Sequence, residues 1–188
     1  MTVADTLDQM CAEPAFQQEL VDFLVAMCAV DTTPSADVAA MRRHEAGVFS
    51  LVRAYLQETP WRIDQRPIDP DIAAHPAFSK LHFTKTPEHP DGLTPEQASA
   101  ERSNLLVLAD GEPGSAGRGT AVNAHVDVIA PFMPPTRRGD LVRGRGTIDD
   151  KGHVAAICAA LRLIGRMTAG GAVTLRNSIT AMFPVEEE

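Results

Sequence analysis

The protein is a chain of 188 residues, 44% of them hydrophobic, and its 17 basic and 25 acidic side chains give a formal net charge of −8. A chain of this length and apolar content can bury one sizeable core, which excludes intrinsic disorder and a disulfide-dependent miniature fold. The acidic balance, without basic runs interleaved with aromatics, disfavours nucleic-acid binding. The longest apolar segment, residues 20–30, is too short to span a membrane and contains Asp22.

The cysteines and the N-terminus both indicate a cytoplasmic protein. Cys11, Cys28 and Cys158 show no CxxC or CxxH spacing and are interpreted as reduced, mostly buried thiols. The first residues carry acids where a secretory signal would carry basic side chains, and no sustained apolar stretch precedes Pro14.

Two amphipathic helices are predicted in the first third of the chain. Apolar residues recur at spacings of three and four over residues 16–30 and again over residues 36–57, which is typical of helices with one buried face. Pro14 marks the start of the first helix, and residues 31–34 mark its end.

A proline-rich stretch follows a short alternating strand at residues 61–64. Seven of the 14 prolines lie between residues 60 and 95, and we interpret residues 70–100 as a surface excursion. Within it, Thr94 to Gln97 has the residue order of a capping box, so a short helix is predicted to start there.

The second half of the chain alternates strands with a helix. Apolar runs at residues 104–109 and 120–129 predict two adjacent strands, residues 152–167 predict a helix, and residues 177–185 predict the last strand. This alternation favours an α/β sandwich whose central strands are buried on both faces, and we find no internal repeat.

The first polar cluster of interest is His125 with Asp127, near the end of a predicted strand. Ligands of α/β sheets gather beyond the carboxyl ends of the strands. Residues i and i+2 of a strand share a face, so Asp127 could accept a hydrogen bond from one ring nitrogen of His125 while the other nitrogen binds a metal. The alternative is a histidine satisfied by a nearby backbone carbonyl.

The second cluster is Asp149 and Asp150, in a glycine-rich turn directly before the predicted helix. The two acids could be simple caps, since Asp is favoured at a helix start. A nucleotide-binding loop is disfavoured, because Asp149 stands where the GxGxxG pattern needs its third glycine and no GxxxxGK[ST] motif exists.

The third cluster is Glu186, Glu187 and Glu188, at the end of the last predicted strand. Three such acids can be a solvated tail, but the apolar strand before them would carry them to the sheet edge that His125 and Asp149 also reach. Carboxylates with an imidazole suit zinc, manganese or cobalt, and a carboxylate can bridge two ions. A free carboxylate there could take a proton from water and pass it to a leaving amine.

These three clusters, in this order, resemble the metallopeptidase family of acetylornithine deacetylase, succinyl-diaminopimelate desuccinylase, aminoacylase and glutamate carboxypeptidase. The likeness spans most of residues 16–69 and 103–188, whereas residues 70–100 match nothing general. It implies a three-layer α/β sandwich with a mostly parallel central sheet, like the zinc aminopeptidases and incomplete at its C-terminal side. The chain would then be the N-terminal portion of a metallohydrolase catalytic domain.

The resemblance also implies roles for individual residues. His125 and Glu188 would be metal ligands, Asp149 would bridge two zinc ions, Asp127 would orient His125, and Glu187 would be the general base. Asp150 would then support the site or cap the helix. A one-residue slip would move the base and the ligand to Glu186 and Glu187. Co²⁺ or Mn²⁺ could replace Zn²⁺.

Two departures from the family pattern limit this reading. The stretch from His125 to Asp149 looks short, and the family's aromatic-rich segment is reduced to residues 131–135. The sequence stops at Glu188, before two further ligands and the lid domain that usually forms the dimer, so a homodimer is expected only where that domain is present.

The leading hypothesis is therefore a metal-dependent hydrolase that cleaves an amide bond in an N-acyl amino acid or a small peptide. It would have no nucleic-acid or membrane partner. The alternative hypothesis is a truncated, non-catalytic fragment that binds metal weakly or acts as an interaction module.

Overall fold

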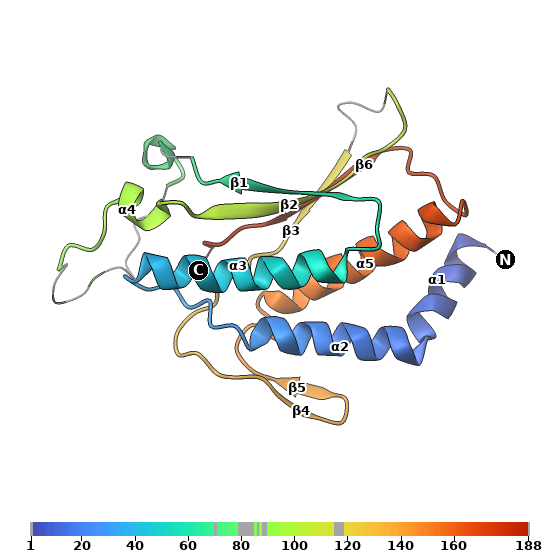
Figure 1. Cartoon of the computed structure of the whole chain (residues 1–188), viewed down its shortest axis with the longest axis horizontal. Helices are drawn as coiled ribbons and strands as arrows, with labels where there is room; N and C mark the ends of the chain where they lie inside the picture. The colour runs from blue at the N-terminus through green and yellow to red at the C-terminus, as the bar shows by residue number, and fades with distance from the viewer. Residues whose placement is uncertain are drawn as a thin grey trace.

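The protein folds as a mixed sheet packed against long helices, as its computed structural model shows (Figure 1). The structure describes residues 2–69, 71–78, 85, 87, 90–114 and 119–187. The helices are α1 (Val3–Ala12), α2 (Pro14–Cys28), α3 (Val38–Tyr55), the 3-10 turn η1 (Ile72–Ala74), α4 (Pro95–Ser99) and α5 (Lys151–Ala169). The strands are β1 (Arg62–Pro67), β2 (Ser103–Ala109), β3 (Gly119–Asn123), β4 (Thr136–Arg138), β5 (Leu141–Arg143) and β6 (Ser178–Phe183).

The helices with a clear apolar period lie where the sequence predicts them. The predictions over residues 16–30, 36–57 and 152–167 correspond to α2, α3 and α5, with ends that differ by one to two residues. The capping box at Thr94 is also confirmed, since its hydroxyl accepts from the Gln97 amide and the Gln97 side chain accepts from the Thr94 amide.

The predicted strands exist, but the one expected over residues 120–129 ends at Asn123, and the predicted order was wrong in one respect. The order is β1-β2-β6-β3, so β6 lies between β2 and β3, which were expected to be neighbours. The parallel arrangement holds for β3 and β6, and the chain between them includes α5, the kind of crossover that parallel neighbours need. In contrast, β1 with β2 and β2 with β6 run antiparallel.

The core lies between the sheet and one layer of helices. Leu105 and Val107 of β2 are fully buried against side chains of α2, α3 and α5, whereas Leu106 and Leu108, which alternate with them, are only partly buried. Figure 1 shows these three helices together on one side of the sheet. The α/β class is thus confirmed, and the described part of the chain comprises the sheet and one helical layer of the expected sandwich.

Helix α1, the 3-10 turn η1 and the strands β4 and β5 were not predicted from the sequence. Helix α1 begins at a capping box formed by Thr2 and Asp5. A separate two-stranded sheet pairs β4 with β5. The described part of residues 70–100 contains η1 and α4. No described helix has the length and apolar character needed to cross a membrane.

Candidate metal centre

His125 follows β3 on a segment that continues alongside the chain after β6. The Ala124 amide donates to the carbonyl of Met182 at 3.2 Å, and the Val126 amide donates to the carbonyl of Pro184 at 3.0 Å. From the other side, the Thr32 hydroxyl donates to the carbonyl of Val126 at 2.6 Å. His125 is therefore held at the carboxyl end of a parallel strand pair, with only 6% of its surface exposed.

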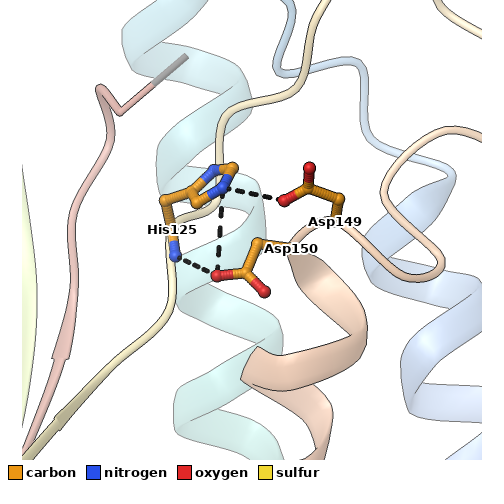
Figure 2. A group of neighbouring side chains, drawn as sticks. All are labelled: His125, Asp149 and Asp150. Carbon is orange, nitrogen blue, oxygen red and sulfur yellow. Dashed lines mark hydrogen bonds and ion pairs between the residues drawn. The ribbon is translucent and has the colours of Figure 1, made fainter.

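Asp149 and Asp150 lie at the start of α5, facing His125 (Figure 2). The peptide bond between them is cis. Asp150 occupies the N-cap position, but its carboxylate makes no cap hydrogen bond. It accepts instead from the backbone amide of His125 at 3.1 Å and pairs with the ring of His153. Asp150 thus ties the start of α5 to the segment that carries His125.

Three carboxylates surround the Nε2 atom of His125. The nearest oxygens are Oδ1 of Asp149 at 3.2 Å, Oε2 of Glu187 at 3.5 Å and Oδ2 of Asp150 at 3.9 Å. The side chains of Asp149 and Glu187 are 76% and 61% exposed, so both are accessible from solvent and free to adjust. The two aspartates come from the start of α5 and Glu187 comes from the segment after β6, and all three converge on one imidazole nitrogen.

The other ring nitrogen of His125 faces Asp127. Its Nδ1 lies 3.1 Å from the backbone carbonyl oxygen of Asp127 and 3.3 Å from the carboxylate Oδ1. The sequence left open whether a carboxylate or a backbone carbonyl would be the partner of His125. Asp127 provides both. In the tautomer that donates from Nδ1, the lone pair of Nε2 points toward the three acids.

The charges around His125 favour a cation there. Burial lowers the pKa of this imidazole, but the charge and carbonyl of Asp127, with the charges of Asp150 and Glu187, outweigh burial and leave the pKa above its ordinary value. The same excess of negative charge that favours a proton on Nε2 favours a divalent metal ion there.

The donor set fits a zinc-like ion. One ligand atom each from His125, Asp149 and Asp150 lies within 4.8 Å of the others. One imidazole nitrogen with carboxylate oxygens is a donor set that zinc, manganese and cobalt accept in proteins.

The sequence-predicted residues divide into three groups. His125, Asp127, Asp149 and Glu187 are brought together. Glu186 turns the other way and pairs with the buried Arg102, a residue that sequence reasoning missed. Glu188, predicted as a metal ligand, lies outside the described residues.

Comparison with known proteins identifies the fold. No family model and no curated protein sequence matches the chain. Among solved structures, it is similar to human carnosine dipeptidase 1, with a TM-score of 0.60 and 17% identity over 91% of this chain and 32% of that one. It is also similar to the dipeptidase Dug1p from Saccharomyces cerevisiae, with a TM-score of 0.53 and 14% identity over 96% of this chain and 33% of that one.

A third similar structure is the aminopeptidase PepT from Bacillus cereus, with a TM-score of 0.50 and 14% identity over 89% of this chain and 36% of that one. The chain thus spans about a third of the length of these peptidases. At such identities the likeness shows a shared fold, and it agrees with the zinc-aminopeptidase-like fold expected from the sequence.

Proposed function

We propose that this chain carries part of the active site of a dinuclear metal-dependent hydrolase that cleaves an amide bond in a small peptide or an N-acyl amino acid. The observation that carries the proposal is the convergence of Asp149, Asp150 and Glu187 on Nε2 of His125. The likeness in fold to solved dipeptidases and an aminopeptidase favours the same class of reaction.

Each residue of the cluster has a distinct role in this proposal. His125 and Asp149 would hold the metal ions, and Glu188 is proposed as a further ligand. When bound, the zinc ions supply Lewis-acid polarisation of the amide carbonyl and make water more acidic. Asp127 fixes the orientation of the imidazole through Nδ1, which keeps Nε2 available as a ligand.

Glu187 is the proposed general base. Its Oε2 lies 3.5 Å from Nε2 of His125, its side chain is 61% exposed, and its backbone amide donates to Oδ2 of Asp127 at 2.9 Å. A carboxylate beside the metal-binding atoms and open to solvent can take a proton from water and pass it to the leaving amine. The buried Asp127 thus holds both His125 and the backbone that carries the base.

The experiment combines zinc binding with hydrolysis, in the protein as its native source produces it. Zinc is titrated by calorimetry, and dipeptides and N-acetyl amino acids are screened by mass spectrometry with and without added zinc. Asp149→Asn is expected to weaken zinc binding and abolish hydrolysis. Asp140→Asn, a matched change at an exposed acid of the β4–β5 turn, should alter neither.

Two outcomes would decide against the proposal. Unchanged zinc binding and hydrolysis in Asp149→Asn would remove the metal role of this cluster. Weak zinc binding without hydrolysis by the native protein, together with an intact mass near 20.2 kDa, would favour the non-catalytic alternative. Should activity be found, we expect it in the cytoplasm, and the assay also separates deacylase from peptidase activity.

A further inference from the structure

Arg102 is a buried cation that joins three parts of the fold. It lies just before β2, and its side chain is 1% exposed. Its Nε and Nη2 donate to Oε1 of Glu45 on α3 at 3.0 and 2.7 Å, and its Nη1 donates to the carbonyl of Ala98 on α4 at 3.1 Å. These contacts alone would neutralise the buried guanidinium with the Glu45 carboxylate and anchor α4 to α3.

The remaining contacts of Arg102 reach the segment after β6. Nη1 donates to Oε2 of Glu186 at 2.6 Å, and Nη2 donates to the backbone carbonyl of Val185 at 3.1 Å. Among the described residues Oε1 of Glu186 has no hydrogen-bond partner, so the bond from Arg102 alone holds this carboxylate. One guanidinium therefore holds both a side chain and the backbone of the segment that enters the metal centre.

These contacts determine which acid faces His125. Successive side chains of an extended segment point to opposite sides. Glu186 is drawn to Arg102 on one side, while Glu187 lies 3.5 Å from His125 on the other, and the Glu187 amide is bound by Asp127. A rotation that released Glu186 from Arg102 would also turn Glu187 away from the imidazole.

We propose that Arg102 is a positioning residue that holds Glu186 and the carbonyl of Val185 so that Glu187, and not Glu186, is presented to the metal centre. The inference rests on the proposed function in that Glu187 is taken as the base. The placement of the segment itself is testable without metal or substrate.

The test measures amide hydrogen exchange in the metal-free protein. The reporters are the amides of Val126, which donates to Pro184, and Glu187, which donates to Asp127. The variants are Arg102→Lys, which keeps the charge but loses the planar, multiply donating guanidinium, and Glu186→Ala, which removes only the bond to the Glu186 side chain. In Glu186→Ala, Arg102 keeps its partners Glu45 and the Val185 carbonyl.

We expect the reporter amides to exchange at least about tenfold faster in both variants, since a charge-assisted hydrogen bond has been lost. The Ala124 amide, which donates to the carbonyl of Met182 directly after β3, should keep its protection. Arg42→Met is the matched control, because it removes a partly exposed arginine whose ion pair with Glu101 does not touch the segment. It should leave all three amides unchanged.

Zinc binding and hydrolysis give the functional readouts. The zinc affinity of both variants should fall about tenfold or more, as is usual when residues behind a metal site are changed. In the active protein, kcat should fall while KM stays close to the wild-type value. If the reporter amides exchange faster in the two variants but the wild type shows no hydrolysis, the positioning role is retained and the proposed function is rejected.

Normal protection of Val126 and Glu187 in both variants would overturn the positioning role, whatever the activity. Glu186→Ala keeps the inference falsifiable should Arg102→Lys fail to fold, because the side chain of Glu186 is 21% exposed and its removal leaves the buried Arg102–Glu45 pair intact.

Discussion

Gly152, in the first turn of α5, lies against the loop that carries the two aspartates. A Cβ atom added there would lie 2.4 Å from the backbone carbonyl oxygen of Thr147 and 3.1 Å from its carbon, and the Gly152 amide also donates to the carbonyl of Gly146 at 3.0 Å. Ordinary contact between these atoms needs about 1 Å more, and only a shift of the backbone can provide it.

We therefore expect Gly152→Ala to destabilise the fold by about 1–3 kcal/mol, the usual cost of overpacking. In a chain of this size that lowers Tm by roughly 2–4 °C for each kcal/mol. Displacement of Thr147 also moves Asp149 relative to His125, so zinc affinity should fall by about tenfold or more. The free energy of unfolding is measured by urea denaturation, and zinc affinity by competition with a chromophoric chelator.

Gly47→Ala is the control with the opposite sign. Gly47 lies within α3, and an added Cβ would meet the methyl groups of Val30 at 3.8 and 4.0 Å, which is ordinary contact. Removing a glycine from a helix interior should stabilise the fold by about 0.5–1 kcal/mol and leave zinc binding unchanged. Wild-type stability and zinc affinity in Gly152→Ala would refute the steric argument.

Three further predictions concern single side chains. Glu187→Gln should lower kcat about 10²–10⁴-fold, by the loss of the base, while zinc still binds, and loss of less than tenfold would exclude this role. Asp127→Asn should weaken zinc binding about 10–100-fold, because His125 and the Glu187 backbone lose their common partner, and unchanged affinity would argue against it. Burial raises the pKa of the Cys28 thiol to about 11, so the stability it contributes is complete below pH 9 and is lost as the pH rises toward 11. Between pH 8 and 10 the free energy of unfolding of the wild type should fall by about 1 kcal/mol more than that of Cys28→Ala. Cys11→Ala, altered at an exposed thiol, should behave like the wild type. Parallel pH profiles for all three proteins would contradict the predicted sign.

Periodicity predicts single elements well and their order poorly. The apolar stripes of α2, α3 and α5 encode both the helix and its buried face, so these helices follow from local sequence. The position of β6 between β2 and β3 does not, because the chain order places it last and pairing depends on partners far away in the sequence. In contrast, the helix predicted between the strands that became β3 and β6 already favours a parallel pairing of these two strands.

Helix α1 and the β4–β5 hairpin were missed because their local signals are weaker. Residues 3–12 form a helix with no buried residue, so it lacks the stripe that identified the other helices, although Thr2 and Asp5 form a capping box. In the β4–β5 hairpin the signal is Gly139-Asp140 between two short strands, a turn pair that favours a hairpin, and Gly139 has φ = 58°. Both strands are mostly exposed and therefore carry no clear alternation.

The convergence of the candidate site could be anticipated, but the choice among its acids could not. Strand ends and a helix start brought His125, Asp149 and Glu187 together as expected. Spacing within three successive glutamates leaves the register open. In the structure Arg102 binds Glu186, and Glu187 is the glutamate that faces His125. Arg102 is 84 residues from Glu186 in sequence, so local spacing does not reveal this contact.

Each segment of the site is in fact held by a buried polar contact with a part of the chain that is distant in sequence. The Thr32 hydroxyl, 94 residues away, binds the carbonyl of Val126 beside His125. Lys151, beside the two aspartates, is fully buried and donates to the carbonyls of Met27 and Val30 at the end of α2. Arg102 holds the third segment. Buried polar groups are costly unless partnered, so each contact fits one arrangement only. Sequence patterns therefore predict which side chains assemble, whereas long-range polar contacts set their positions.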